Sequence, residues 1–267
     1  MIESKKRWQL TSPDEQAVQN LQQALSLSSV LAKILVTRGI DTVDKAEEFL
    51  AVELSGIHNP FLMKDMDLAV ARIQQAIEAE EKILVYGDYD ADGVTSTTVM
   101  MTVLEDLGAD VSFKIPNRFD HGYGPNAELF KEAHAEGVNL IVTVDNGVSG
   151  IEPVRLANEL GMDVIISDHH DIGDEMPEAL AIIHPRHPQG NYPFGELAGV
   201  GVAFKMAQAL YGDIPEHLTE LVAIGTIADL VPLHGENRVL VKEGLRALQD
   251  SPMPAIAALA DVAGVKQ

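Results

Sequence analysis

Between residues 82 and 211 the chain alternates short apolar runs with helical stretches, and this alternation constrains the fold more than any other feature. The runs are four or five residues long and rich in Val and Ile, as in strands that are buried on both faces. Strands are expected at 83–86, 111–115, 140–144, 164–167 and 181–184. Because strands joined through helices form right-handed crossovers, the pattern predicts an α/β fold with a parallel sheet flanked by helices.

Helical patterns fill the intervals between the strands and both flanks. Between and after the strands, helices are expected at 95–107, from about 126, and at 150–160, 198–211, 215–227 and 238–249. Before residue 82 no run resembles a strand, and short helices are expected at 13–25, 28–38, 43–50 and 67–79. Ser28 and Asp67 are predicted N-caps, and Gly39 is a predicted C-terminal stop. The predicted organisation is a helical N-terminal arm over 1–81 that precedes the α/β domain.

The chain is strongly acidic and has no cysteine. It carries 19 Lys and Arg against 41 Asp and Glu, a formal net charge of −22, and residues 83–267 hold 10 of the basic and 28 of the acidic side chains. This balance argues against a broad basic surface for nucleic acid and is compatible with carboxylates gathered around a cation. The missing cysteine excludes disulfide scaffolds and Cys-ligated zinc or iron–sulfur centres. A hydrophobic fraction of 46% excludes a disordered chain.

The sequence contains no signal for secretion or membrane insertion. Residues 1–8 include basic side chains, but no apolar segment follows them. No apolar run approaches the roughly 20 residues of a spanning helix. We therefore expect a cytoplasmic protein.

Three carboxylates follow the first predicted strand. Asp88, Asp90 and Asp92 alternate with other residues between Gly87 and Gly93. Alternate residues of an extended backbone point the same way, so the three side chains could converge on one small volume. Carboxylates that close repel one another and raise a pKa unless a cation neutralises them. The segment therefore indicates a site for a divalent cation.

Further candidate ligands follow later segments. They are Asp145 after the third strand, Asp168, His169 and His170 after the fourth, and Asp229 after the apolar stretch 221–228. The carboxyl ends of parallel strands meet at one edge of a sheet, where α/β proteins form their sites. Oxygen and imidazole ligands without sulfur suit Mn²⁺ or Mg²⁺. Two such ions can activate a water and hold a phosphoryl group for in-line attack.

Each of these motifs also has a simpler structural explanation. An Asp after a strand, such as Asp145, is often a helix N-cap, and Asp-Gly and Asn-Gly pairs are often only turns. Adjacent histidines in a loop are often solvated. The combination across four separate segments is what favours a metal centre.

Four motifs, taken in order, resemble those of the DHH phosphoesterase superfamily. They are Asp-Tyr-Asp-Ala-Asp-Gly at 88–93, Val-Asp-Asn-Gly at 144–147, Asp-His-His at 168–170 and Ile-Ala-Asp-Leu-Val-Pro-Leu at 227–233. Supporting stretches lie at 35–40, 115–118, 122–124 and 197–204. Within the superfamily the chain is similar to single-strand-specific DNA exonucleases over essentially its whole length.

The resemblance implies a set of metal ligands for two Mn²⁺ or Mg²⁺ ions. These ligands would be Asp90, Asp92, Asp145, His169 and Asp229. Asp145 would bridge the two ions. Asp88 and Asp168 would be further ligands, or would orient His169 or a water.

The resemblance also implies contacts with the substrate and one departure from the family pattern. His170 would face the scissile phosphate and take part in catalysis, and Arg118 would be a further phosphate contact. Some members have a His upstream of the first Asp pair, where this chain has Tyr86. One ion would then be held less tightly, or Asp88 would substitute.

The implied activity is metal-dependent 5′→3′ hydrolysis of single-stranded DNA in repair and recombination. The substrate partner would be single-stranded DNA, with a single-strand-binding protein and a helicase as candidate protein partners. Residues 82–235 would form the phosphoesterase domain. Longer members continue into a domain with a Gly-Gly-His motif and an OB-fold, neither of which is visible before Gln267. Residues 236–267 are therefore expected to lead towards a C-terminal domain that would supply much of the DNA-holding surface.

Three other functions remain open from the sequence. The first is a phosphoesterase of the same superfamily that acts on oligonucleotides, cyclic dinucleotides or pyrophosphate. The second is a haloacid-dehalogenase-type phosphatase with Asp90 as its nucleophile, which leaves the Asp-His-His motif unexplained. The third is a catalytically incomplete scaffold, which would be expected to lack ligands that are present in this chain.

Overall fold

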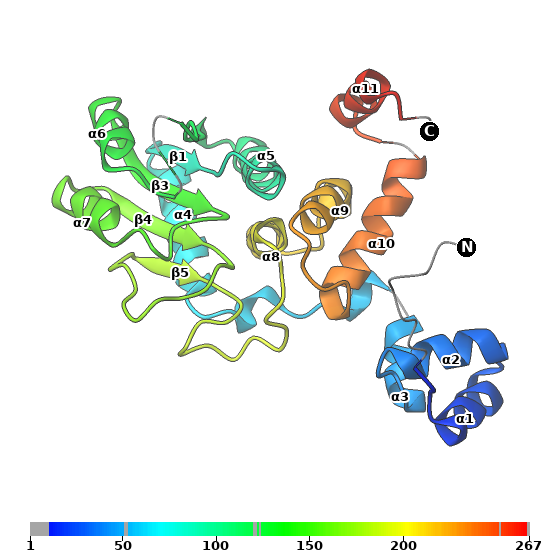
Figure 1. Ribbon diagram of the computed structural model, residues 1–267. Helices are drawn as coiled ribbons and strands as arrows, with labels where there is room; N and C mark the ends of the chain where they lie inside the picture. The colour runs from blue at the N-terminus through cyan, green and yellow to red at the C-terminus, as the bar shows by residue number, and fades with distance from the viewer. Residues whose placement is uncertain (1–10, 51–52, 120–121, 123, 251, 266–267) are drawn as a thin grey trace, which may run out of the picture. The chain divides into compact units, whose positions relative to one another are not determined.

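The computed structural model describes residues 11–50, 53–119, 122, 124–250 and 252–265. Residues 1–8 and Tyr123 of the 122–124 stretch lie outside the described residues. The chain forms two compact units, Met1–Val52 and Glu53–Gln267 (Figure 1). Within the described part of the chain, no helix is both long and apolar enough to cross a membrane.

The first unit consists of helices, as predicted. They are α1 (Glu15–Leu25), α2 (Ser29–Thr37) and α3 (Val43–Leu50), and they enclose a small core of Val18, Leu21, Ala32, Leu35 and Ala46. Ser28 caps α2, because its hydroxyl accepts a hydrogen bond from the Leu31 amide at 3.3 Å. Gly39 follows the end of α2 with a φ of +83°, which terminates the helix.

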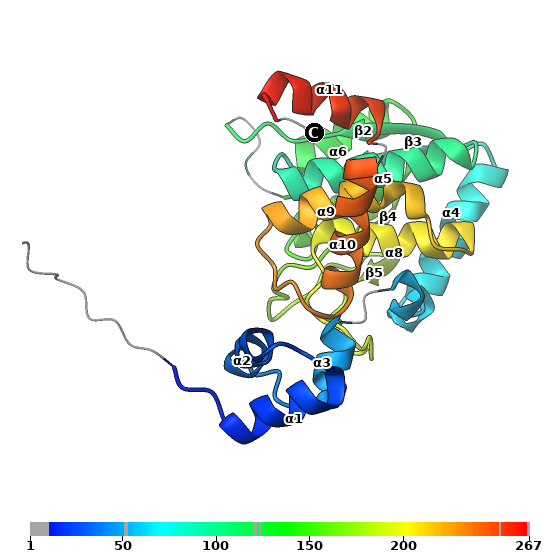
Figure 2. The ribbon, with the colours of Figure 1, turned by 90° about the vertical axis from the view of Figure 1, so that its right-hand side faces the viewer.

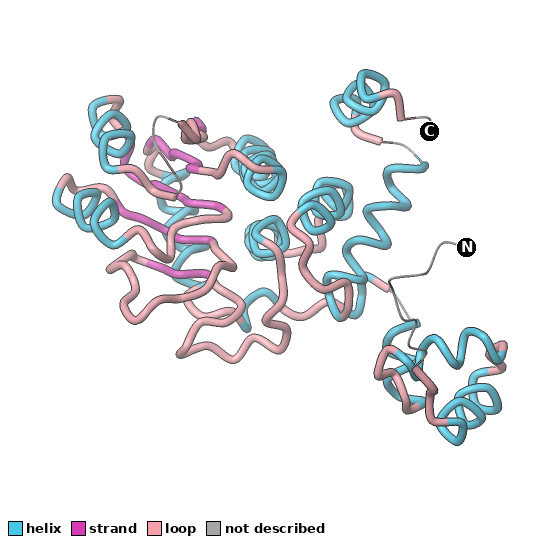
Figure 3. The backbone as a smooth tube through the Cα atoms, in the orientation of Figure 1, coloured by secondary structure: helices cyan, strands magenta, loops and turns pink. Residues whose placement is uncertain are grey.

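The second unit is built on a five-stranded parallel sheet. The strands are β1 (Lys82–Tyr86), β2 (Asp110–Lys114), β3 (Val138–Val144), β4 (Asp163–Ser167) and β5 (Ala181–Ile183). They lie in the order β2-β1-β3-β4-β5, and every neighbouring pair is parallel (Figure 3). The predicted α/β class and all five predicted strands are confirmed.

Helices cover both faces of this sheet. Helices α6 (Ala127–Ala135) and α7 (Ile151–Glu159) pack on one face, and α4 (Met66–Glu78), α5 (Ala91–Asp106) and α8 (Gly199–Tyr211) lie on the other. Side chains alternate along each strand, so Val85 joins the larger core and Tyr86 the smaller. Burial on both faces explains why the strands are continuous apolar runs.

Three helices continue the layer beyond α5 and α8. They are α9 (Thr219–Ala228), α10 (Gly235–Asp250) and α11 (Pro254–Ala263), and short 3₁₀ turns lie at Leu54–Gly56, Pro60–Leu62 and Glu216–Leu218. Helix α9 packs on α5, and α10 packs on α9 (Figure 2). A buried ion pair between Lys205 Nζ and Glu236 Oε1, 3.1 Å apart, joins α8 to the start of α10.

Two predicted boundaries differ from the structure. Helix α4 belongs to the second unit, because Ala69 and Ile73 are buried in the larger core, so the compact units divide after Val52 and not at residue 81. Asp67 does not cap this helix: Asp65 occupies the cap position with a φ of +63° and makes no side-chain cap bond.

Helix α5 begins at Ala91, four residues before the predicted start, because Asp90 caps it. The Asp90 Oδ1 atom accepts a hydrogen bond from the Gly93 amide at 2.9 Å. The acidic motif 88–92 therefore forms the strand-to-helix turn itself.

Candidate metal centre

The acidic motifs meet between β1 and β3, where the helices that follow the two strands lie on opposite faces of the sheet. Helix α5, which follows β1, packs in the larger core, whereas α7, which follows β3, packs in the smaller one. In an open α/β sheet, the crevice between two such neighbouring strands is the usual position of a site. Residues 88–92 leave β1 and Asp145 leaves β3, so both carboxylate groups lie at this crevice.

Asp145 is held in an unusual backbone conformation. Its φ is +59°, a left-handed value that costs a non-glycine residue about 1–3 kcal/mol. The Asp145 amide donates to the Ser167 carbonyl at 2.9 Å, and the buried Asn146 Nδ2 donates to the Val144 carbonyl at 2.9 Å. Asp145 does not cap α7, whose N-cap is Gly150. The turn therefore serves to aim the buried Asp145 carboxylate.

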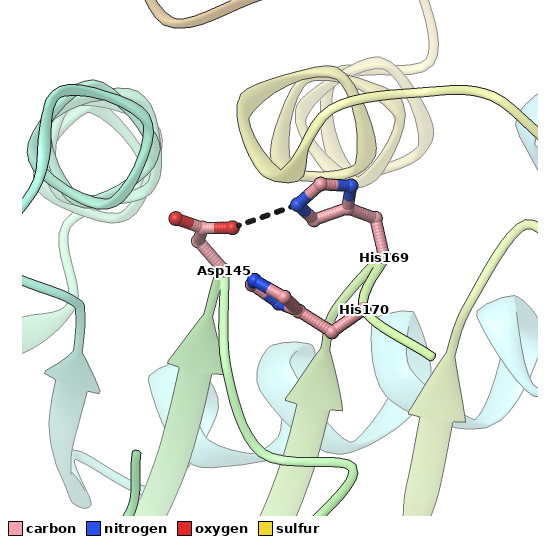
Figure 4. A group of neighbouring side chains, drawn as sticks. All are labelled: Asp145, His169 and His170. Atoms are coloured by element: carbon pink, nitrogen blue, oxygen red, sulfur yellow. Dashed lines mark ion pairs between the residues drawn. The ribbon is translucent and has the colours of Figure 1, made fainter. Parts of the chain in front are cut away.

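Three carboxylates surround one nitrogen of His169. Its Nε2 atom lies 3.2 Å from Asp145 Oδ1, and 3.7 Å from Asp92 Oδ2 and from Asp229 Oδ2. Figure 4 shows Nε2 turned towards Asp145, with the His170 ring beside the pair. Asp145 Oδ1 and His169 Nε2 are buried and have no hydrogen-bond partner among the described residues. Orphaned buried polar atoms are costly, and a cation between them would satisfy both.

Ligand atoms come within 4.8 Å of one another in three groups. The groups are Asp92, His169 and Asp229; Asp145, His169 and His170; and Asp88, Asp90 and Asp145. Asp145 and His169 each belong to two groups. The oxygen and imidazole donor set fits Mn²⁺ or Mg²⁺, and its overlap leaves room for more than one ion.

The start of α8 holds Asp92 and approaches Asp145. The amides of Gly199 and Val200 donate to the two oxygens of Asp92 at 2.7 and 2.8 Å. A Cβ atom on Gly199 would lie 2.3 Å from Asp145 Oδ1, so only glycine fits there. Likewise, a Cβ on Gly225 of α9 would lie 2.8 Å from Asp92 Oδ1. Neither Gly199 nor Gly225 was predicted as a site residue, although Gly199 lies in the 197–204 stretch that resembles the family.

The carboxylates raise one another's pKa. Burial, with the charge of Asp90 next, raises the pKa of Asp145 to about 8. Burial and the charge of Asp145 raise the pKa of Asp92 well above its usual value. Burial also raises the pKa values of Asp88 and Asp229. The cluster therefore resists full ionisation until a cation replaces its protons.

Asp168 fixes the conformation of the Asp-His-His turn through hydrogen bonds to both of its carboxylate oxygens. Its Oδ1 accepts hydrogen bonds from the amide of His169 at 2.7 Å and from the amide and Nδ1 of His170 at 3.1 and 2.8 Å. Its Oδ2 accepts from the Val148 amide at 3.0 Å. Asp168 lies outside the three groups of candidate ligands. Of the two roles that the sequence left open, the contacts of Asp168 match orientation and not metal ligation.

The pairing with Asp168 changes the titration of both partners. The hydrogen bond to Asp168 raises the pKa of His170 to about 9, although burial opposes this. Burial by itself would raise the pKa of Asp168, but its hydrogen bonds with His170 and Val148 lower it. Asp168 is therefore ionised and His170 protonated at neutral pH.

His184 and Arg186, which follow β5, donate hydrogen bonds to backbone carbonyl groups of the same turn. His184 Nδ1 accepts a hydrogen bond from the Arg186 amide at 2.9 Å, so the proton of the neutral ring is on Nε2, which donates to the His170 carbonyl at 2.8 Å. Arg186 Nη2 donates to the His169 carbonyl at 2.6 Å. Neither residue was predicted as part of the site. The only signal was the sequence His-Pro-Arg directly after the last strand.

Arg118 and Tyr86 occupy different faces of the unit. The exposed Arg118 guanidinium lies 5.4 Å from the ring centre of Tyr89, between Asp88 and Asp90 in the first motif, so Arg118 stands at the rim of the centre. The Tyr86 hydroxyl donates to the Gly124 carbonyl at 3.1 Å, and its ring packs on Phe130 in the opposite core. Tyr86 therefore does not take the place of a ligand histidine.

The arrangement of motifs can be compared with known proteins. The sequence model described as "DHH family, N-terminal domain" matches residues 82–226. This chain belongs to the DHH family. Membership rules out the haloacid-dehalogenase alternative, and the cap position of Asp90 within the DHH motif accounts for that residue.

Curated DHH-family relatives are exonucleases of greater length. The chain is 51% identical over 249 residues to the single-stranded-DNA-specific exonuclease RecJ of Bacillus subtilis, covering 93% of this chain and 32% of that protein. It is 37% identical to RecJ of Escherichia coli, covering 89% of this chain and 43% of that protein. The chain thus spans less than half the length of these relatives.

Solved structures of RecJ have the same fold as this chain. The crystal structure of RecJ from Thermus thermophilus in complex with Mn²⁺ matches with a TM-score of 0.80 at 32% identity, covering 96% of this chain and 37% of that chain. A crystal structure of exonuclease RecJ bound to manganese matches with a TM-score of 0.70 at 39% identity, covering 76% of this chain and 52% of that chain.

Proposed function

We propose that this chain carries the hydrolytic site of a metal-dependent exonuclease that degrades single-stranded DNA in the 5′→3′ direction. The observation that carries the proposal is the convergence of all four DHH motifs on the unpartnered atoms His169 Nε2 and Asp145 Oδ1. The relatives named single-stranded-DNA-specific exonuclease RecJ and the structure of Thermus thermophilus RecJ with Mn²⁺ support it.

Two Mn²⁺ or Mg²⁺ ions would be held by the clustered carboxylates and His169. The ligands would be Asp88, Asp90, Asp92, Asp145, His169 and Asp229. When bound, such ions lower the pKa of a water and neutralise charge on the phosphate. The amides of Gly199 and Val200 keep Asp92 in place, and the left-handed turn at Asp145 aims its carboxylate without further rearrangement.

His170 and Arg118 would bind the scissile phosphate. Asp168 fixes Nδ1 of His170 and keeps the ring protonated, so the other ring nitrogen presents an N–H and a positive charge. That group would stabilise charge on a non-bridging oxygen. Arg118, stacked on Tyr89 at the rim, would contact the same or the next phosphate.

Residues 82–235 would form the phosphoesterase domain, and 236–267 would lead towards the remainder found in the longer relatives. Repair and recombination would be the cellular setting, in the cytoplasm. A single-strand-binding protein and a helicase would supply the substrate strand.

The test is hydrolysis, by this protein, of single-stranded DNA labelled at its 5′ end. We expect Mn²⁺-dependent release of the 5′ label as short products, with little cleavage of duplex DNA. The same assays with cyclic dinucleotides, oligonucleotides of two to five residues and pyrophosphate test the small-substrate alternative. Turnover confined to those substrates would refute the proposal. Failure to bind Mn²⁺ in calorimetry would favour the scaffold alternative.

A further inference from the structure

One face of α10 carries a groove that lies outside the candidate metal centre. The groove has a volume of about 470 Å³, and its lining includes Arg238, Lys242, Arg246, Leu233, Val241 and Leu245. Positions four residues apart share a helix face and differ by about 6 Å in rise. The three cations therefore form a regular row along one side of an aliphatic floor.

This row concentrates positive charge in an acidic part of the chain. Residues 83–267 contain 10 basic side chains against 28 acidic ones, and the groove has three of the basic ones. Of the three acidic residues of α10, Glu236 is buried against Lys205, Glu243 pairs with Arg246 at 3.0 Å, and Asp250 is the last residue of the helix. The groove is complementary to a ligand with regularly spaced negative charges.

The groove is close to the metal centre in sequence, and its helix α10 packs on α9, the helix that precedes Asp229. Asp229 ends α9, and α10 begins at Gly235 after a short connection that includes Leu233 of the groove. Asn237 Nδ2 donates to the Pro232 carbonyl at 3.1 Å, which fixes this connection to α10. Helices α9 and α10 pack against each other (Figure 2).

We propose that the α10 groove binds the sugar–phosphate backbone of a single DNA strand that passes to or from the metal centre. The inference rests on the proposed function. The row of cations would pair with successive phosphates, and Leu233 and Leu245, 42% and 44% exposed, would contact the sugars. The lining residues described for the groove include no aromatic ring, so bases would not stack there and binding would be independent of sequence.

The test compares two double variants that remove the same charge. Lys242→Gln with Arg246→Gln alters the groove, and Lys131→Gln with Arg155→Gln alters α6 and α7 on the other face of the sheet. All four side chains are exposed. Binding of fluorescent dT20 is measured by anisotropy over 50–300 mM KCl with Mn²⁺, in a shared Asp145→Asn background that prevents turnover.

We expect the groove variant to bind dT20 on the order of tenfold more weakly at 50 mM salt, with a log–log salt slope smaller by about 1.4, since each lost phosphate contact removes about 0.7. The control variant should bind dT20 within about twofold of the protein that carries Asp145→Asn alone. Equal losses in both doubles, or no loss in the groove variant, would overturn the groove while leaving the proposed function intact. No dT20 binding by the Asp145→Asn protein with its groove intact would also overturn the groove, whereas the hydrolysis assay of the unaltered protein tests the proposed function separately.

Discussion

His169 Nε2 lies 3.2 Å from Asp145 Oδ1, and both buried atoms lack a hydrogen-bond partner within the described residues. Their residues come from the ends of neighbouring strands β4 and β3, so the sheet itself fixes their separation. Because the protein leaves both atoms without a partner, they are preorganised for a bound cation. The free-energy cost of burying them is offset by the packing of the rest of the fold.

Asp145→Asn should separate metal binding from folding. Asn tolerates the left-handed backbone at this position, so the turn should persist. We expect Mn²⁺ affinity to fall by about 100-fold or more, since even residues behind a ligand contribute about 10–100-fold. Without metal, the melting temperature should stay equal or rise, because a neutral amide replaces a buried carboxyl group that resists ionisation. Calorimetry and thermal melts measure the two effects, and undiminished Mn²⁺ binding would remove Asp145 from the ligand set.

The metal-free protein should lose stability as pH rises from 5 to 9. Asp145 and His170 both have raised pKa values when folded, about 8 and about 9. The folded state therefore binds more protons than the unfolded state in this range, and each such group lowers the unfolding free energy by at most about 1.4 kcal/mol per pH unit.

Urea titrations at pH 5, 6, 7, 8 and 9 in EDTA would measure this trend. His184 and His187, whose pKa values are lowered by burial, act in the opposite direction below about pH 6.5, and Asp168 does so only below about pH 4. Saturating Mn²⁺ should reverse the slope, because its binding releases protons. Stability that rises with pH in EDTA would contradict the arrangement of charges.

Asp168→Asn should release His170 from its protonated state. The raised pKa of His170 depends first on the hydrogen bond with Asp168, so it should fall from about 9 towards its ordinary value. Imidazole resonances followed by NMR across pH 5–10 measure this directly. Activity at pH 8 should drop more than activity at pH 6. The matched variant Asp174→Asn, which alters an exposed carboxylate six residues after Asp168, should leave the His170 titration unchanged.

Gly199→Ala should damage the metal centre from the side of α8. The added Cβ would lie 2.3 Å from Asp145 Oδ1, so either the helix start or the carboxylate must move. We expect at least about a tenfold loss of Mn²⁺ affinity and a destabilisation of about 1–3 kcal/mol. Gly201→Ala on the same helix meets only the Leu197 side chain at 3.1 Å and should bind Mn²⁺ normally. Equal behaviour of the two variants would show that α8 does not constrain Asp145.

Arg186→Ala should loosen the Asp-His-His turn while the fold persists. The lost contacts are the charge-assisted hydrogen bond from Nη2 to the His169 carbonyl and the exposed ion pair with Asp171 at 3.2 Å. Because the Arg186 side chain is 45% exposed, its removal should change stability by less than about 1 kcal/mol. Mn²⁺ affinity should fall by about 3- to 10-fold. Arg155→Ala, an exposed arginine on α7 that pairs with Glu152 and Glu159, is the control and should have no effect on Mn²⁺.

The strands and their acidic ends were predictable because both depend on local patterns. Continuous apolar runs identify strands buried on two faces, and the parallel topology brings Asp92, Asp145 and His169 to one edge. The role of Gly199 was not predictable, because the atoms that it must avoid belong to Asp145, far away in sequence. The carbonyl contacts of His184 and Arg186 depend in the same way on a turn that only the assembled sheet creates.

The first boundary illustrates a different limit. Helical periodicity identified α4, but the choice of core against which α4 packs is a tertiary property. Composition changes at residue 82, where strands begin, whereas the compact units separate after Val52. A change in local pattern therefore marked the start of the sheet and not the edge of a folding unit.

Asp229 at the end of α9 links the metal centre to the stability of the fold. Asp92 and Asp229 flank His169 from opposite ends of the α/β unit's sequence, and everything between them must be folded before the three can meet. An ion shared by these side chains closes a loop of well over a hundred residues, in the manner of a reversible cross-link. Binding of the ion would then stabilise the folded state by mass action, and removal of the ion would make the protein more susceptible to proteolysis.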